Sequence, residues 1–191
     1  LRGSGNEILV KNCVFSNFQR GSAPNDLFFA KIHVTGGSTK VFNNSVAVSF
    51  GGFVTQDVIS AVSASNNAVL IDPNGGNIDG IYTEEYGGNV VYFSDSSTGN
   101  EINAVGNVQD LGSNITNQTP GFIDVASNDL SISAASAAAQ NGIELSDVTE
   151  DIEGTPRGIL PYLRGGFLLN EVIYDAGAYQ ITTEIASDRL K

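Results

Sequence analysis

Two stretches, NCVFSNF at residues 12–18 and KVFNNSVAVS at residues 40–49, share one pattern of alternating apolar and polar residues with asparagines at the breaks. Alternation with a period of two predicts β-strands. Asparagine favours bends, because it tolerates a left-handed backbone better than most residues do. In the first stretch we expect Cys13 and Phe15 to point inward and Asn17 to mark a corner.

Similar short segments recur through the first 130 residues, separated by clusters of Gly, Asn, Asp and Ser such as GGST, SNN and DSSTGN. These residues form turns, and no long helical pattern intervenes. Onsets at Asn6, Thr39, Asn67, Asn89 and Asn100 suggest coils of roughly 20–30 residues, as in repeat architectures. A β-sandwich is the alternative. We favour a parallel solenoid, because the NG and DG signals of tight hairpins are scarce.

The charge balance excludes several partners. The chain carries 21 Asp and Glu against 9 Lys and Arg, for a formal charge of -12. Such a surface repels nucleic-acid backbones and anionic membranes, and it is compatible with neutral glycans or cations. Cys13 is the only cysteine, so no internal disulfide forms. No apolar stretch is long enough to span a bilayer, and the abrupt start LRGSGNEILV suggests a processed chain or a fragment.

The C-terminal third resembles the ending of bacterial right-handed parallel β-helix proteins of the choice-of-anchor Q type, within the pectate-lyase-like superfamily. Four ordered blocks carry the resemblance: Pro120, Phe122 and Asp124; Asp129, Leu130, Ile132, Ser136 and Gly142; Asp151, Gly154 and Arg157; Asp175, Gly177, Ala178 and Tyr179. The sequence departs from the family pattern at Ala137, Gln140 and Gln180, and GILPYLRGGFLLNEVIY reads as an insertion.

The expected fold is therefore all-β: a right-handed parallel β-helix with its coils in residues 1–130 and a C-terminal capping region in residues 131–191 of the same domain. In the cap, SAASAAAQNG is expected to form a short helical turn on the last coil. Asp151 and Arg157 are expected to pair, with Asp175 competing for the same guanidinium and Tyr179 closing the segment. We interpret this cluster as a structural latch, with a ligand or metal site as the alternative.

Catalytic signals are weak. His33 is the only histidine, and it has no recognisable nucleophile beside it in the sequence. No catalytic residue, metal ligand or cofactor is assigned, although calcium stays open. We interpret the carboxylates of the central strands as solvated, and the three N-x-[ST] asparagines as corner residues. These carboxylates are Asp57, Asp72, Asp79, Glu84, Glu85 and Asp95, and the asparagines are Asn43, Asn114 and Asn117.

The leading functional hypothesis is a structural and binding module of the cell surface, the extracellular space or a virion surface, such as an adhesin or fibre. A carbohydrate or another surface component is the expected partner, and Tyr82, Glu84, Tyr86 and Tyr92 are the candidate contacts. Core packing is the alternative for the tyrosines. A polysaccharide lyase or glycoside hydrolase is the rival function, and a piece of a larger assembly of chains is a third. Nucleic acid and membrane insertion are not expected.

Overall fold

The computed structural model describes residues 2–4, 7–19, 32–35, 38–50, 55–73, 76–95, 99–164 and 167–181. These residues are all-β, as the sequence predicts, with no α-helix and a single 3-10 turn, η1 (Val125–Ser127). Among them, no helix is long and apolar enough to cross a membrane. The strands are β1 (Arg2–Ser4), β2 (Glu7–Lys11), β3 (Val14–Gln19), β4 (Ile32–Thr35), β5 (Ser38–Phe42), β6 (Ser45–Ser49), β7 (Thr55–Ser60), β8 (Ser63–Ser65), β9 (Ala68–Asp72), β10 (Asn77–Gly87), β11 (Val90–Phe93), β12 (Ile102–Asp110), β13 (Phe122–Asp124), β14 (Asp129–Ile132), β15 (Gly158–Arg164) and β16 (Phe167–Ile173).

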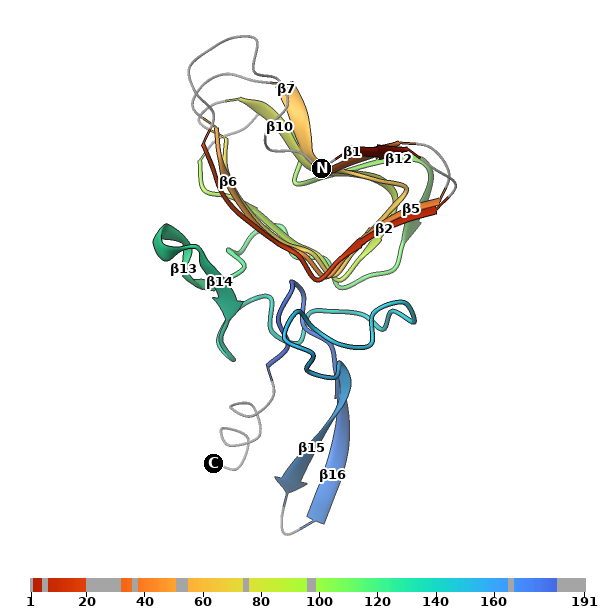
Figure 1. The fold of residues 1–191 in the computed structure, drawn as a ribbon, viewed down its shortest axis with the longest axis vertical. Helices are drawn as coiled ribbons and strands as arrows, with labels where there is room; N and C mark the ends of the chain where they lie inside the picture. The colour runs from red at the N-terminus through yellow and green to blue at the C-terminus, as the bar shows by residue number, and fades with distance from the viewer. Residues whose placement is uncertain are drawn as a thin grey trace.

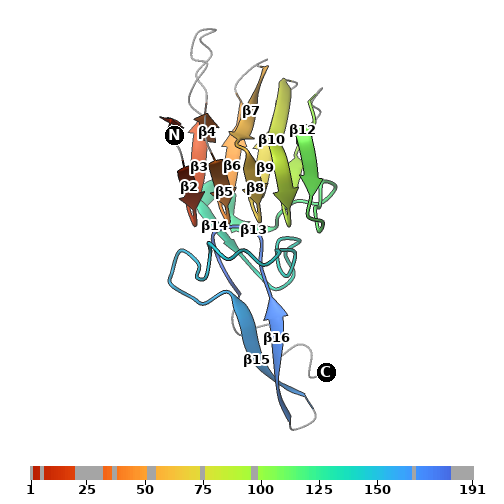
Figure 2. The ribbon, with the colours of Figure 1, turned by 90° about the vertical axis from the view of Figure 1, so that its right-hand side faces the viewer.

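Two parallel sheets make up the body of the molecule. The larger has the order β1-β4-β7-β10-β8-β5-β2 with β12 beside β10, and the smaller has the order β11-β9-β6-β3. Every strand pair within them is parallel. Seen end-on, strands of successive units lie behind one another (Figure 1), and from the side they run across the body in a row (Figure 2). This arrangement is compatible with a β-helix and not with a sandwich of antiparallel hairpins.

Four repeating units consist of a strand, a two-residue corner and a second strand, and a fifth corner follows β12 with only an isolated bridge at Ile115 beyond it. The first corner residue has a positive φ, between 52° and 64°, at all five corners. The corners are Asn12–Cys13, Asn43–Asn44, Asn66–Asn67, Gly88–Asn89 and Ser113–Asn114. The expected corner at Asn17 is therefore wrong. Asn17 lies within β3, because the left-handed residue that bends the chain in this unit is Asn12.

The second corner residue builds an asparagine ladder through the stack. The Asn44 Nδ2 donates to Asn67 Oδ1 at 3.0 Å, Asn67 Nδ2 to Asn89 Oδ1 at 3.1 Å, and Asn89 Nδ2 to Asn114 Oδ1 at 3.2 Å. Asn44, Asn67 and Asn89 are almost completely buried, so these bonds satisfy amides that would otherwise be costly to bury. Cys13 occupies the ladder position of the first unit, where its backbone N–H donates to Asn44 Oδ1 at 3.1 Å.

The core consists of apolar columns that follow the strand register. Phe15, Val46, Val69 and Val91 are register partners across the smaller sheet. The three valines are buried, and Phe15 packs against the same cluster, as does Cys13. Both residues thus contact the core, as the alternation predicts. A second column of isoleucines, Ile59, Ile81 and Ile102, follows the larger sheet.

The C-terminal region lies along the corners instead of closing one end of the stack (Figures 1 and 2). The segment SAASAAAQNG forms turns, not a helix, and its Ala138 packs with Ala68 and Val90 beside the corners of two different units. The expected placement on the last coil therefore differs from the structure. The domain boundary at residue 131 stays a prediction.

Two antiparallel hairpins follow the parallel body, β13–β14 and β15–β16. The second lies in the insertion-like stretch GILPYLRGGFLLNEVIY. It extends away from the parallel sheets (Figures 1 and 2).

Candidate functional site

The outer face of β7, β10 and β12 combines polar and aromatic residues. Register places Ser60, Tyr82 and Asn103 side by side on neighbouring strands. The Tyr82 side chain is 38% exposed, and Glu84, two residues along the same strand, is also exposed. Between them Thr83 is buried, because successive strand residues point to opposite faces. Tyr82 and Glu84 therefore share one accessible face.

Two carboxylates flank this row. Asp57 and Asp79 are register partners on β7 and β10. Asp79 accepts from the Asn103 Nδ2 at 2.7 Å and from the Asn100 backbone N–H at 2.9 Å. These bonds hold the carboxylate and the neighbouring amide in fixed positions, so the face carries negative charge in an ordered polar setting.

The other two candidate tyrosines are Tyr86, which is also on β10, and Tyr92. Tyr86 is in register with the buried Ala64 and is only half-exposed. Burial raises the pKa of its hydroxyl, with a further contribution from the carboxylate of Asp110. Tyr92 is on β11 in the smaller sheet. The structure thus places Tyr82, Glu84 and Tyr86 along one strand and separates Tyr92 from them.

The predicted latch residues come together under the corners. Arg157 is buried, and its guanidinium donates to three backbone carbonyls: Asp175 O at 3.1 Å, Gly177 O at 2.9 Å and Glu150 O at 3.3 Å. Burial lowers the pKa of Arg157 to about 10, and the attraction of Asp151 and Asp175 opposes this shift only in part. The guanidinium thus joins residues 150, 175 and 177 at one point, and the expected ion pair with Asp151 or Asp175 is wrong, because carbonyl oxygens take the place of the carboxylates.

The two acids of the latch are held by backbone donors. Asp151 Oδ1 accepts from the Glu153 and Thr155 N–H groups at 2.8 and 2.7 Å, and Asp151 Oδ2 accepts from the Gln180 N–H at 2.9 Å. Asp175 accepts from the Gln140 and Ile181 N–H groups, each at 2.6 Å. Such bonds fix loops that have no regular structure of their own.

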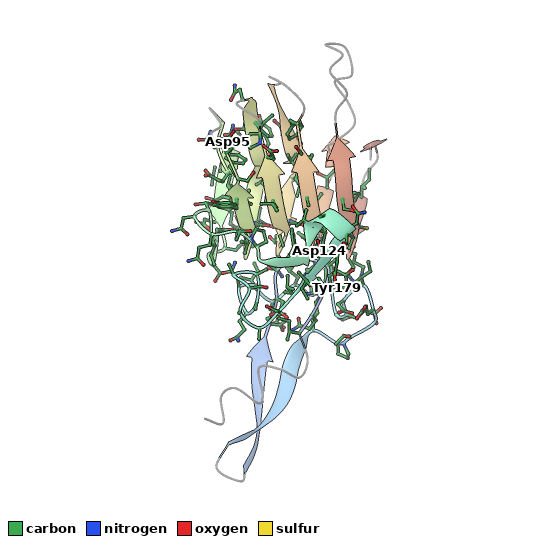
Figure 3. All side chains as sticks on the ribbon, turned by 90° about the vertical axis from the view of Figure 1, so that its left-hand side faces the viewer. Asp95, Asp124 and Tyr179 are labelled. Atoms are coloured by element: carbon green, nitrogen blue, oxygen red, sulfur yellow. The ribbon has the colours of Figure 1, made fainter. Side chains whose placement is uncertain are left out.

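Tyr179 belongs to the same region. It lies in the C-terminal segment beneath the β13–β14 hairpin, with Asp124 above it and Asp95 far off on the parallel body (Figure 3). Burial raises the pKa of the Tyr179 hydroxyl, and the carboxylates of Asp129, Glu153 and Asp151 raise it further. The arrangement joins loops that are far apart in the sequence, which a latch would require. The latch role itself stays a prediction.

Three corner asparagines that were not predicted as site residues hold the C-terminal region to the body. Asn66 accepts from the Ile143 N–H at 2.8 Å and donates to the Ile143 carbonyl at 2.7 Å. Asn12 donates to Glu150 O at 2.7 Å, and Asn43 donates to Asp175 O at 3.4 Å. These are the left-handed first residues of the corners. The sequence signal for these contacts is the NN doublet at residues 43–44 and 66–67. Its first asparagine bonds to the C-terminal region, and its second bonds along the ladder.

Gly88 replaces asparagine at the fourth corner for a steric reason. Its φ is +64°, and a Cβ there would lie 2.2 Å from Asn66 Oδ1 and 2.9 Å from the Ile143 nitrogen. Only glycine lets the C-terminal segment approach this closely. Of the three sequon asparagines, Asn43 and Asn114 are corner residues as predicted, whereas Asn117 lies in an exposed bend.

Asp175 should give the protein an unusual dependence on pH. Burial raises the pKa of its carboxyl, and backbone hydrogen bonds offset this only in part. The folded state then holds the proton more tightly than the unfolded chain, so this residue's contribution to stability improves as the pH falls through the raised pKa. The wild-type free energy of unfolding minus that of Asp175→Asn should therefore increase as the pH falls, and urea denaturation at several pH values measures this difference.

Asp124→Asn is the matched control with the opposite sign. Hydrogen bonds from Ser127 lower the pKa of the exposed Asp124 carboxyl. Its contribution to stability is present at neutral pH and is lost as the pH falls through the lowered pKa. The wild-type free energy of unfolding minus that of Asp124→Asn should therefore decrease on acidification. A difference for Asp175→Asn that stays constant with pH would contradict the assignment.

The described residues contain no group of three or more His, Cys, Asp or Glu side chains placed to hold a metal ion. His33 lies on β4 in register with Ser60, and its side chain is outside the described set. In comparisons with known proteins, no family model, no curated protein and no solved structure matched the chain. The resemblance of the C-terminal third stays a prediction.

Proposed function

We propose that this chain is a right-handed parallel β-helix that serves as an extracellular or surface-associated binding module, on a cell or a virion. Parallel pairing from unit to unit supports the solenoid, with ladder spacings of 22, 23, 25 and 31 residues. Right-handed crossovers are nearly universal between parallel strands of one sheet, which supports the hand. The proposed partner is a glycan that contacts the outer face of β7, β10 and β12.

Exposed Tyr82 within an ordered polar row is the observation that carries the proposal. An aromatic ring on a sheet face offers a flat apolar surface, and a neighbouring amide group offers hydrogen bonds. Half-buried Asn103 flanks Tyr82 in register and is ordered by Asp79, whereas Ser60, the register partner on the other side, is buried. The acids Asp57, Asp79 and Glu84 disfavour anionic polymers on this face. Neutral or amino-bearing glycans are the ligands that fit.

Replacing Tyr82 with alanine should weaken glycan binding about tenfold, which corresponds to about 1.4 kcal/mol. Tyr82→Phe should retain most of the affinity, because the ring and not the hydroxyl supplies the flat surface. Isothermal titration with neutral, amino-bearing and uronic-acid oligosaccharides measures both effects after a glycan array selects the ligand.

Tyr92→Ala is the control, since Tyr92 lies on the smaller sheet away from this face. It should leave the affinity unchanged. Equal losses for Tyr82→Ala and Tyr92→Ala, or binding restricted to polyuronates, would contradict the proposed face.

Asp57 and Asp79 favour the rival function. The two carboxylates are register partners on neighbouring strands, and strands lie about 4.8 Å apart, close to the carboxylate separation of retaining glycosidases. A hydrolase would release reducing ends from a bound glycan, and Asp57→Asn would abolish that release without abolishing binding. A binding module would show no release in either form.

A further inference from the structure

The β15–β16 hairpin lacks the support that such a hairpin needs. Among the described strands, β15 and β16 pair only with each other. An isolated two-stranded hairpin is marginally stable in water, and three or more strands are usually required. The strands have the sequences GILPYLR and FLLNEVI, which are mostly apolar. A projecting apolar hairpin of this kind needs a further strand or surface to cover it.

One edge of the hairpin is blocked, and no described strand pairs with the other. Pro161 pairs with Asn170, and because proline has no N–H, this pair must be of the non-hydrogen-bonded type. Proline then faces the outer edge of β15 and removes a donor there, which is how natural sheets blunt an edge. Pair types alternate, so the N–H and C=O groups of Leu168, Asn170 and Val172 face the outer edge of β16. That edge keeps all its donors.

We propose that the outer edge of β16 pairs with the same edge of a second copy of this chain. An antiparallel pairing about a two-fold axis at Asn170 joins β16 to its counterpart over all seven residues, and the two hairpins become one four-stranded sheet. An interface of this type uses the same surface on both copies and closes at two.

Charge and geometry favour a second copy. The whole chain has a formal charge of -12, but the two strands carry one arginine, Arg164, and one glutamate, Glu171. The hairpin is thus a neutral region of an otherwise repulsive molecule. It extends away from the parallel sheets, which leaves room for two bodies (Figure 2). Lipid fits less well, because hydrocarbon cannot satisfy the open backbone groups of β16.

Sedimentation velocity on the full chain tests the proposal over a wide concentration range. We expect a reversible monomer–dimer equilibrium. Asn170→Pro removes an outward N–H at the centre of the interface and should give a monomer. Leu163→Pro is the matched control, since it makes the same change on the outer edge of β15 and should leave the dimer intact. A monomeric wild type, or equal effects of the two prolines, would overturn the proposal.

Disulfide trapping keeps the test decisive if a proline variant fails to fold. Cys13 is the only cysteine, so Cys13→Ser provides a clean background. Asn170→Cys places two thiols opposite each other across the axis and should form a covalent dimer under mild oxidation. Leu168→Cys, which pairs with Val172 of the other copy, should not. Equal trapping at both positions, or a monomer that cosediments with phosphatidylcholine vesicles, would overturn the two-fold pairing.

Discussion

Replacing Asn67 with alanine should lower the free energy of unfolding by about 2–6 kcal/mol. The Asn67 side chain accepts from the Asn44 backbone N–H at 3.1 Å and donates to the Val41 carbonyl at 2.8 Å. Alanine leaves both backbone groups without this partner inside the corner, and an unsatisfied buried group costs about 1–3 kcal/mol. It also breaks the ladder bonds to Asn44 and Asn89. Urea denaturation followed by circular dichroism measures the loss.

Two further variants separate the ladder from a general effect of losing asparagine. Asn117→Ala changes an exposed residue and should shift stability by less than about 0.5 kcal/mol. Asn67→Asp keeps the acceptor but places a carboxylate against Asn89 Oδ1, so it should be more destabilising at neutral pH than at acidic pH, where a protonated acid can donate. Equal stability of Asn67→Ala and Asn117→Ala would show that the ladder contributes little.

Much of the parallel body is predictable from the sequence because its determinants are local. Alternation in VFNNSVAV indicates strands, and asparagine indicates the bend between them. Position within the corner was harder to predict. Asn12 follows Lys11 and Asn17 follows Ser16, so both asparagines come after a polar residue, and the backbone φ of 52° at Asn12 is what marks the corner. Asn17 instead falls where β3 shifts register against β6, an irregularity that depends on the neighbouring strand.

The C-terminal region was predictable in its parts and not in its placement. The sequence placed Asp151, Arg157 and Asp175 in one cluster, but the expected pairing of Arg157 with the acids is wrong, because its guanidinium donates to backbone carbonyls and the acids accept from backbone N–H groups. The position of the region depends on contacts over more than a hundred residues, such as Ala178 with Ser45 and Asn12 with Glu150. No local pattern encodes such a contact. For the candidate face, the sequence identified Tyr82 and Glu84 but could not separate them from Tyr92, whose place on the smaller sheet depends on the corner at Gly88–Asn89.

Replacing Arg157 with alanine should loosen the C-terminal region that lies along the corners. The guanidinium holds the carbonyls of Glu150, Asp175 and Gly177, which lie on two segments of that region. Its loss also leaves the buried carboxylates of Asp151 and Asp175 without their cation. Removing one partner from a buried charge cluster costs about 3–5 kcal/mol. Hydrogen exchange at residues 175–181 and limited proteolysis should both accelerate, while the parallel sheets stay protected.

Controls for Arg157 distinguish its geometry from its charge. Arg157→Lys should not restore protection, because an ammonium cannot reach three carbonyls with the fixed fork of a guanidinium. Lys40→Ala breaks an ion pair with Asp147 at 2.6 Å whose side chains are 28% and 39% exposed, so it should cost less than about 1 kcal/mol. The lowered pKa of Arg157 shows that burial opposes its charge more than the two acids support it. The residue therefore fixes the path of the chain at a cost in solvation, and wild-type exchange rates in Arg157→Ala would refute this role.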